Sequence, residues 1–302
     1  MTHSVQIAAR ELVDPQLFAT LEDLELIART LVEGFLHGLH RSPYVGFSVE
    51  FASHREYLPG DDLRHLNWKV FGRQDKLYVK QYDAETNLDL HLLVDWSGSM
   101  TMRSAKVSKH RYAACLAAAL AHLALRQRDA VGLTLFAGEI LDHLKPHSKS
   151  NQLDYILQAL YKTSNRPHAE SVKALHEAAE LMPRRGMVVL ISDLFYDSQE
   201  LFAALDHLRF FGHDILIFQI LDPLERRLPL EGSVRFHDLE TGEELVTQAQ
   251  DIQPAYQVAV ERWLGELDHA SNSRELERVA LITDQPLDRA FYDYLERRCQ
   301  HY

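Results

Sequence analysis

The sequence places one carboxylate and two hydroxyls close together in a short segment. Asp95, Ser97 and Ser99 follow the apolar run Leu92-Leu93-Val94, which is typical of a buried strand. In an open parallel sheet, ligands bind just beyond the carboxyl ends of the strands. Carboxylate and hydroxyl oxygens are the donors that Mg²⁺, Mn²⁺ and Ca²⁺ prefer. The pattern therefore predicts a cation site at a strand end. The same residue types also suit a helix N-terminus, where they would cap the helix and bind nothing.

Two further apolar runs end in a carboxylate. Val188-Val189-Leu190-Ile191 leads to Ser192 and Asp193, and the run 215–221 leads to Asp222. Because the carboxyl ends of parallel strands meet at one edge of a sheet, Asp193 is expected near Asp95. Asp193 thus joins Asp95, Ser97 and Ser99 as a candidate metal ligand. Three carboxylates at strand ends also permit an alternative, a metal-dependent phosphohydrolase that uses Asp95, Asp193 and Asp222.

Along the segments that position these residues, the hydrophobic pattern alternates between one typical of strands and one typical of helices. Apolar runs and alternating patterns predict strands, and three-to-four spacing of apolar residues predicts helices between them. Strands are expected at 88–95, 130–136, 140–144, 187–192 and 215–221, and helices at 106–126, 153–160, 171–182 and 199–211. This order is typical of an α/β fold with a mostly parallel sheet and helices on both faces.

The remaining segments suggest four regions in the chain. A helical segment is expected in 1–45, with its helix at 14–39, followed by a small β-rich segment in 46–85. The main α/β domain spans 86–250 and ends in a hairpin, with strands at 234–237 and 244–246. A C-terminal α/β extension, 251–302, is expected to pack on it, with helices at 252–267 and 286–298 and a strand at 279–282. The charged loop 55–68 is either an internal brace or a partner-binding surface.

Composition places the chain among soluble globular proteins. Its 302 residues carry 32 Lys and Arg against 44 Asp and Glu, a formal charge of −12, which disfavours nucleic acid as a partner. The sequence lacks a secretory signal and a transmembrane segment, so a cytoplasmic location is expected. Its two cysteines are far apart, and Cys115 is expected to be a buried thiol. Because no nucleophile elbow or phosphate loop occurs, the sequence predicts a protein that is not an enzyme.

The motifs resemble two related groups of proteins. Asp95, Ser97, Ser99 and Asp193 resemble the metal-ion-dependent adhesion site of von Willebrand factor A-like domains. From about Gly46 to Val246 the chain resembles the bacterial family called domain of unknown function 58. The segments that carry this second resemblance are Arg55-Glu56-Tyr57, Pro59-Gly60-Asp61-Asp62, Arg64, Asn67-Trp68, Val79-Lys80, Asp95 to Met100, Asp222-Pro223-Leu224-Glu225 and Asp238-Leu239-Glu240-Thr241-Gly242.

The resemblance implies a function in protein binding. Members of the family are linked with MoxR-type AAA+ ATPases, as partners in chaperone-like maturation or regulation, so such an ATPase and a client protein are the expected partners. Asp95, Ser97 and Ser99 would hold Mg²⁺, or alternatively Mn²⁺ or Ca²⁺, directly or through water, with Asp193 assisting. An acidic group of the partner would complete the coordination.

One position departs from the von Willebrand A pattern. That pattern supplies a Thr from a second loop, and the best alignment places Ala169 there. Ser171, Glu170 or Thr163 are the residues nearby that could substitute for the missing hydroxyl. The departure leaves a second alternative open, a scaffold whose metal site is vestigial.

Overall fold

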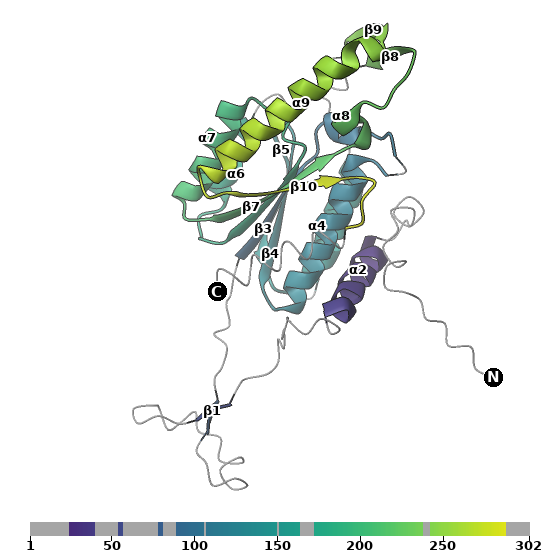
Figure 1. Cartoon of the computed structure of the whole chain (residues 1–302). Coiled ribbons are helices and arrows are strands. Elements are labelled where there is room, and N and C mark those ends of the chain that lie inside the picture. Colours follow the sequence, from purple (N-terminus) through teal and green to yellow (C-terminus); the bar gives the residue numbers. More distant parts are fainter. Residues whose placement is uncertain are drawn as a thin grey trace, which may run out of the picture. The chain divides into compact units, whose positions relative to one another are not determined.

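The computed structural model describes residues 24–39, 54–56, 78–80, 89–105, 107–149, 151–163, 172–237 and 242–287 (Figure 1). The chain forms two compact units, Met1–Leu39 with Leu88–Tyr302, and His40–Asn87. No helix within the described ranges combines the length and the apolar character that a membrane span needs.

The smaller unit contains an antiparallel pair of strands, β1 (His54–Glu56) and β2 (Tyr78–Lys80). Both strands lie in the segment that the sequence predicts to be β-rich. Arg55 and Glu56, expected in a loop, instead belong to β1, because pairing with Val79 and Tyr78 satisfies their backbone groups despite their polar side chains. The rest of the loop 55–68 lies outside the described residues.

The larger unit is built on a six-stranded sheet with the order β10-β7-β6-β3-β4-β5. All neighbouring pairs are parallel except β4 and β5, so the expected mostly parallel α/β sheet is confirmed. The strands are β3 (Asp89–Asp95), β4 (Ala130–Phe136), β5 (Ile140–His147), β6 (Met187–Ser192), β7 (Asp214–Leu221) and β10 (Glu277–Ile282). β10 comes from the segment that the sequence assigns to a C-terminal extension, and it pairs directly with β7.

Helices cover both faces of this sheet, as Figure 1 shows. One face carries α4 (Lys109–Arg126) and α5 (Gln152–Lys162), with α2 (Leu24–Leu39) packed on α4. The other face carries α6 (Lys173–Leu181) and α7 (Ser198–Phe210), whose apolar side chains form one core cluster with β3, β6 and β7. Leu267 of α9 (Ala249–Asn272) closes that cluster. Cys115 of α4 is buried and unpaired, as expected.

Several boundaries differ from the predicted ones. β5 continues past Leu144 through Pro146 to His147, which a strand at the edge of a sheet tolerates because its outer backbone groups need no partner. The predicted hairpin is present as β8 (Ser233–His237) and β9 (Glu244–Gln248). A short helix, α8 (Pro223–Arg227), was not predicted, since five residues are too few for a periodic pattern. The predicted helix at 286–298 falls almost wholly outside the described residues.

Candidate functional site

The candidate residues meet where two neighbouring strands send the chain to opposite faces of the sheet. β3 leads into α4 on one face, and β6, which pairs with β3, leads into α7 on the other. Loops that diverge in this way leave a crevice beyond the strand ends, which is the usual ligand position in open α/β sheets. Asp95 is the last residue of β3, and Asp193 directly follows β6. The predicted meeting of these two strand ends is confirmed.

Asp95 is completely buried, and both of its carboxylate oxygens accept hydrogen bonds. Oδ1 accepts the backbone N–H of Ser97 at 2.9 Å. Oδ2 accepts the hydroxyls of Ser192 and Tyr196, each at 2.6 Å. These donors come from the loop after β3, from the last residue of β6 and from the loop that follows β6, so Asp95 connects the two strand ends.

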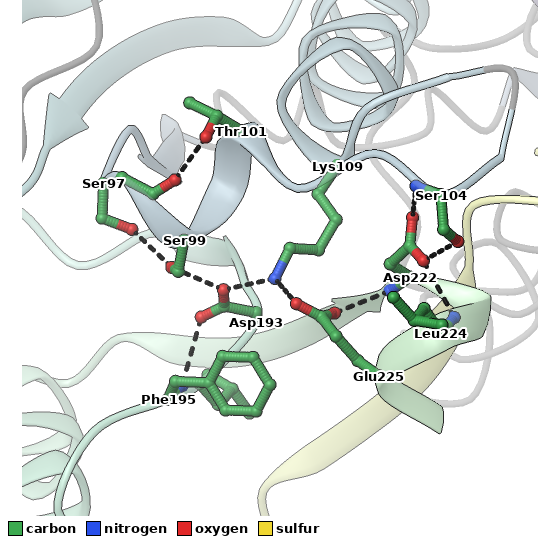
Figure 2. Close-up of polar contacts among 12 residues, drawn as sticks. Ser97, Ser99, Thr101, Ser104, Lys109, Asp193, Phe195, Asp222, Leu224 and Glu225 are labelled. Atoms are coloured by element: carbon green, nitrogen blue, oxygen red, sulfur yellow. Dashed lines mark hydrogen bonds and ion pairs between the residues drawn. The ribbon is translucent and has the colours of Figure 1, made fainter. Parts of the chain in front are cut away.

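The two serines form a chain of contacts that ends on Asp193 (Figure 2). Ser97 Oγ lies 3.0 Å from Ser99 Oγ, and the Ser99 hydroxyl donates to Asp193 Oδ2 at 2.7 Å. Ser99 begins a short 3₁₀ turn, Ser99–Thr101, and its side chain points toward Asp193, the residue that follows β6. The Thr101 hydroxyl donates to the carbonyl of Gly98 and so closes that turn. The four candidate residues therefore do gather at the carboxyl ends of the two central strands, β3 and β6.

A fully buried lysine, which the sequence interpretation missed, lies in the same network. Lys109 Nζ donates to Asp193 Oδ2 at 2.7 Å and to Glu225 Oε1 at 2.6 Å, and it lies 4.9 Å from the centre of the Phe195 ring. Lys109 is the first residue of α4, directly after the N-cap Ser108. A positive charge at a helix N-terminus opposes the helix dipole, and this unfavourable placement was the signal that could have identified it.

Glu225 connects Lys109 to a second cluster around the start of α8. Its Oε2 accepts the backbone N–H of Asp222, and Asp222 in turn caps α8 by accepting the N–H of Leu224. Ser104 binds the same Asp222 carboxylate through both its backbone N–H and its hydroxyl. Asp222 is thus a helix cap that holds the loop after β3 against α8 (Figure 2).

Burial sets the electrostatics of this edge. It raises the pKa of Asp95 to about 6, and the nearby charge of Asp193 adds to the effect, while the hydrogen bonds from Ser192, Tyr196 and Ser97 oppose it. Burial alone would lower the pKa of Lys109, but Asp193 and Glu225 outweigh it, so the pKa lies above the usual value and the side chain is an ammonium. Burial also raises the pKa of Glu225, with Lys109 opposing that effect.

The loop after β6 has a strained backbone and an exposed aromatic ring. Leu194 adopts the left-handed conformation, with φ 63°, which costs energy for a residue with a Cβ. The Ser192 hydroxyl accepts the N–H of Leu194, and Asp193 Oδ1 accepts the N–H of Phe195, so both side chains brace this turn. Phe195 is 44% exposed and stacks on Trp263 of α9 at 5.1 Å between ring centres.

Not every predicted residue is placed. Ala169, Glu170 and Ser171 lie outside the described residues. Thr163 is described, and its backbone carbonyl accepts the indole N–H of Trp96. Across the described ranges, no three His, Cys, Asp or Glu side chains lie close enough together to form a metal centre. The three carboxylates of the phosphohydrolase alternative, Asp95, Asp193 and Asp222, therefore do not form such a centre.

Comparison with known proteins finds relatives without an assigned role. "Uncharacterized protein Rv1480" of Mycobacterium tuberculosis is 28% identical over 260 residues, covering 84% of this chain and 80% of the relative. "Uncharacterized protein Mb1516" of Mycobacterium bovis is similar to the same extent. Among solved structures, the conserved hypothetical protein BatB from Bacteroides thetaiotaomicron is similar with a TM-score of 0.46 and 17% identity, covering 70% of this chain and 99% of that chain.

A second similar structure is an aerotolerance-related membrane protein from Bacteroides fragilis, with a TM-score of 0.44 and 16% identity, covering 70% of this chain and 99% of that chain. The family described as "Protein of unknown function DUF58" matches residues 53–263, which is more than half of the sequence. The chain therefore belongs to the DUF58 family, as its motifs predicted.

Proposed function

We propose that this protein is a von Willebrand A-like protein-binding module without enzymatic activity, and that it binds its partner at the edge formed by the ends of β3 and β6. The divergent loops at this edge and the exposed Phe195 ring support a docking role. The family resemblance suggests a MoxR-type AAA+ ATPase as the partner, in chaperone-like maturation or regulation. A bound divalent cation would attract an acidic group of that partner to an otherwise acidic protein.

One observation carries the cation part of the proposal, the spacing of three oxygens. Ser97 Oγ and Ser99 Oγ are 3.0 Å apart, and Ser99 Oγ and Asp193 Oδ2 are 2.7 Å apart. Neighbouring ligands of octahedral Mg²⁺, with metal–oxygen distances of about 2.1 Å, lie about 3 Å from each other. This spacing of Ser97, Ser99 and Asp193 supports the cation part of the proposal. Asp95, Ser97 and Ser99 would hold it directly or through water, and Asp193 would assist.

The charge of the site fits a cation as well. Within the described residues of this network, the ammonium of Lys109 pairs with Asp193 and Glu225, and Asp95 and Asp222 are two further buried carboxyl groups. Among the residues that the structure describes, the hydrogen-bond donors to Asp95 are neutral: two hydroxyls and a backbone N–H. Burial raises the pKa of Asp95 to about 6 and the charge of Asp193 adds to the effect, so a cation beside Asp95 would favour its ionised form.

A binding titration tests the proposal. The purified protein is titrated with a MoxR-type ATPase in buffer containing Mg²⁺ and in buffer containing a chelator. We expect tighter binding with Mg²⁺, and we expect this gain to disappear in Asp95→Ala and in Ser99→Ala, which removes one hydroxyl from the site. Ser273→Ala, at the exposed end of α9, is the matched control and should behave as the unmodified protein. Equal affinity in both buffers, or an unchanged gain in Ser99→Ala, contradicts the cation bridge.

A separate assay addresses the absence of catalysis. The protein is incubated with phosphoester substrates in Mg²⁺ and in Mn²⁺, and no turnover is expected, since Asp222 is engaged as the cap of α8. Hydrolysis that Asp95→Ala abolishes would instead support a phosphohydrolase.

A further inference from the structure

Lys109 occupies a position that is costly in two ways. Its side chain is fully buried, and its charge lies at the N-terminus of α4, where the helix dipole is already positive. The ammonium compensates through two ion pairs, with Asp193 at 2.7 Å and Glu225 at 2.6 Å, and through the face of the Phe195 ring. The ammonium therefore depends on these two carboxylates, and any change at Asp193 or Glu225 alters its stabilisation.

The ammonium and the candidate cation site share one oxygen. Asp193 Oδ2 accepts both the Ser99 hydroxyl, at 2.7 Å, and Lys109 Nζ, at 2.7 Å. A cation held by Ser99 would therefore lie well within the Debye length of about 10 Å from Lys109, in a buried setting where screening is weak. The two positive charges would repel each other and compete for the same carboxylate.

We propose that Lys109 is a built-in competitor of the divalent cation: its ammonium neutralises Asp193 when no cation is bound, and it lowers the affinity of the site for one. Glu225 weakens this competition, because the ammonium can remain paired with the Glu225 carboxylate while Asp193 binds the cation. The inference rests on the proposed function, because it assigns the regulation of that same cation site. It makes the site a weak one, which responds to the concentration of the cation.

The test compares Mg²⁺ binding to the full-length protein and to two variants by calorimetry, with Mn²⁺ binding followed by electron paramagnetic resonance as a second readout. Lys109→Met keeps an unbranched side chain and removes the charge, so it should lower the Kd for Mg²⁺ about tenfold or more. Glu225→Gln leaves Lys109 with Asp193 as its charged partner and should raise the Kd. A general loss of structure would weaken binding in both variants, so the opposite signs are diagnostic. Lys149→Met, an exposed lysine, is the matched control and should leave the Kd unchanged.

The outcomes separate this inference from the proposed function. If the unmodified protein binds Mg²⁺ and Lys109→Met binds it equally or less tightly while remaining folded, the competitor role is overturned and the cation site stands. If only Lys109→Met binds Mg²⁺, the competitor role is supported and the cation bridge in the natural protein is overturned. Absence of binding to every variant overturns both. Should Lys109→Met fail to fold, Lys109→Gln takes its place, because it keeps hydrogen-bond donors without the charge, and an unchanged or higher Kd in this folded variant contradicts the inference.

Discussion

Tyr196 and Asp95 illustrate how single residues stabilise the edge of the sheet. The Asp95 carboxylate is removed from water, a cost that is met only if its oxygens find donors inside the protein. The Tyr196 hydroxyl is one of three such donors, and it reaches Asp95 from the loop after β6 at 2.6 Å. Burial and the charge of Asp95 raise the pKa of Tyr196 well above its usual value, so this hydroxyl keeps its proton and remains a donor.

Removing this donor should destabilise the protein measurably. In Tyr196→Phe, Asp95 loses a charge-assisted hydrogen bond, and we expect the free energy of unfolding to fall by about 1.5–3 kcal/mol. Urea denaturation at neutral pH measures the change. Tyr161→Phe is the matched control, because Tyr161 is 71% exposed. Similar losses in both variants would mean that the Tyr196 hydroxyl contributes no special stabilisation to Asp95.

At the residue scale the sequence predicted the gathering of the four candidate residues but not the lysine that pairs with one of them. Asp95, Ser97, Ser99 and Asp193 stand at the ends of apolar runs, so local pattern and the geometry of parallel sheets were enough to place them together. Lys109 is 84 positions from Asp193 along the chain, and no local pattern relates the two. Only the packing of α4 over β6 brings that pair into contact.

Among the elements, the pairing of β3 with β6 decides whether the site exists. The start of β6 passes very close to β3: a Cβ built on Gly186 would lie 2.2 Å from the backbone oxygen of Asp89. Gly186 also accepts the N–H of Asp214 through its carbonyl, at the start of β7. The absence of a side chain here allows three strands to begin side by side, and their far ends then carry the candidate residues.

A methyl group at this position should therefore push β3 and β6 apart. Gly186→Ala meets backbone rather than a movable side chain, and we expect a loss of stability of about 1–3 kcal/mol. Gly265→Ala is a control of opposite sign: Gly265 lies in α9 with nothing within 4 Å of an added Cβ, so Ala should stabilise the helix by up to about 1 kcal/mol. Thermal unfolding of both variants measures the two effects. A neutral Gly186→Ala would contradict the close approach of the strands.

Element prediction succeeded where local forces dominate and failed where they do not. β4 and β6 were predicted with their observed bounds, because buried strands are continuous apolar runs. α8 was missed because its stability comes from caps, namely Asp222 and Glu225, and from the contact of Glu225 with Lys109. The predicted end of β5 was too early, since pairing with β4 supports residues that lack a strand pattern of their own.

For the whole molecule, the alternation of strands and helices predicted the class of fold but not the order of the strands. The order β10-β7-β6-β3-β4-β5 depends on which neighbour each strand pairs with. Contacts between residues that are far apart in the sequence determine these pairings. The antiparallel pairing of β5 was indicated by its short turn, but the position of β10 beside β7 had no local signal.

The global stability carries a pH dependence that originates in the core of this sheet. His91 of β3 is 4% exposed, packs edge-on against His213 at 5.6 Å between ring centres, and its Nε2 has no partner within the part of the chain that the structure describes. Burial, with smaller contributions from the neighbouring His213 and His143, lowers its pKa to about 4. The folded protein therefore keeps His91 neutral, whereas the unfolded chain takes up a proton near pH 6.5.

His91 should consequently make the protein sensitive to mild acid. Because the folded pKa lies below the unfolded one, the contribution of His91 to the free energy of unfolding is fully present above about pH 6.5. It is lost as the pH drops toward 4, which lowers the free energy of unfolding by up to about 3 kcal/mol. Urea denaturation at intervals between pH 7 and pH 4 measures the slope. Buried His110, with a pKa also lowered to about 4, acts in the same direction, and Asp95, with a pKa raised to about 6, acts in the opposite one. His91→Leu should therefore reduce the loss of stability on acidification by up to about 3 kcal/mol without abolishing the pH dependence, while His237→Gln, on the exposed hairpin, should leave the curve unchanged. An equally steep curve for His91→Leu would place the acid sensitivity in other groups.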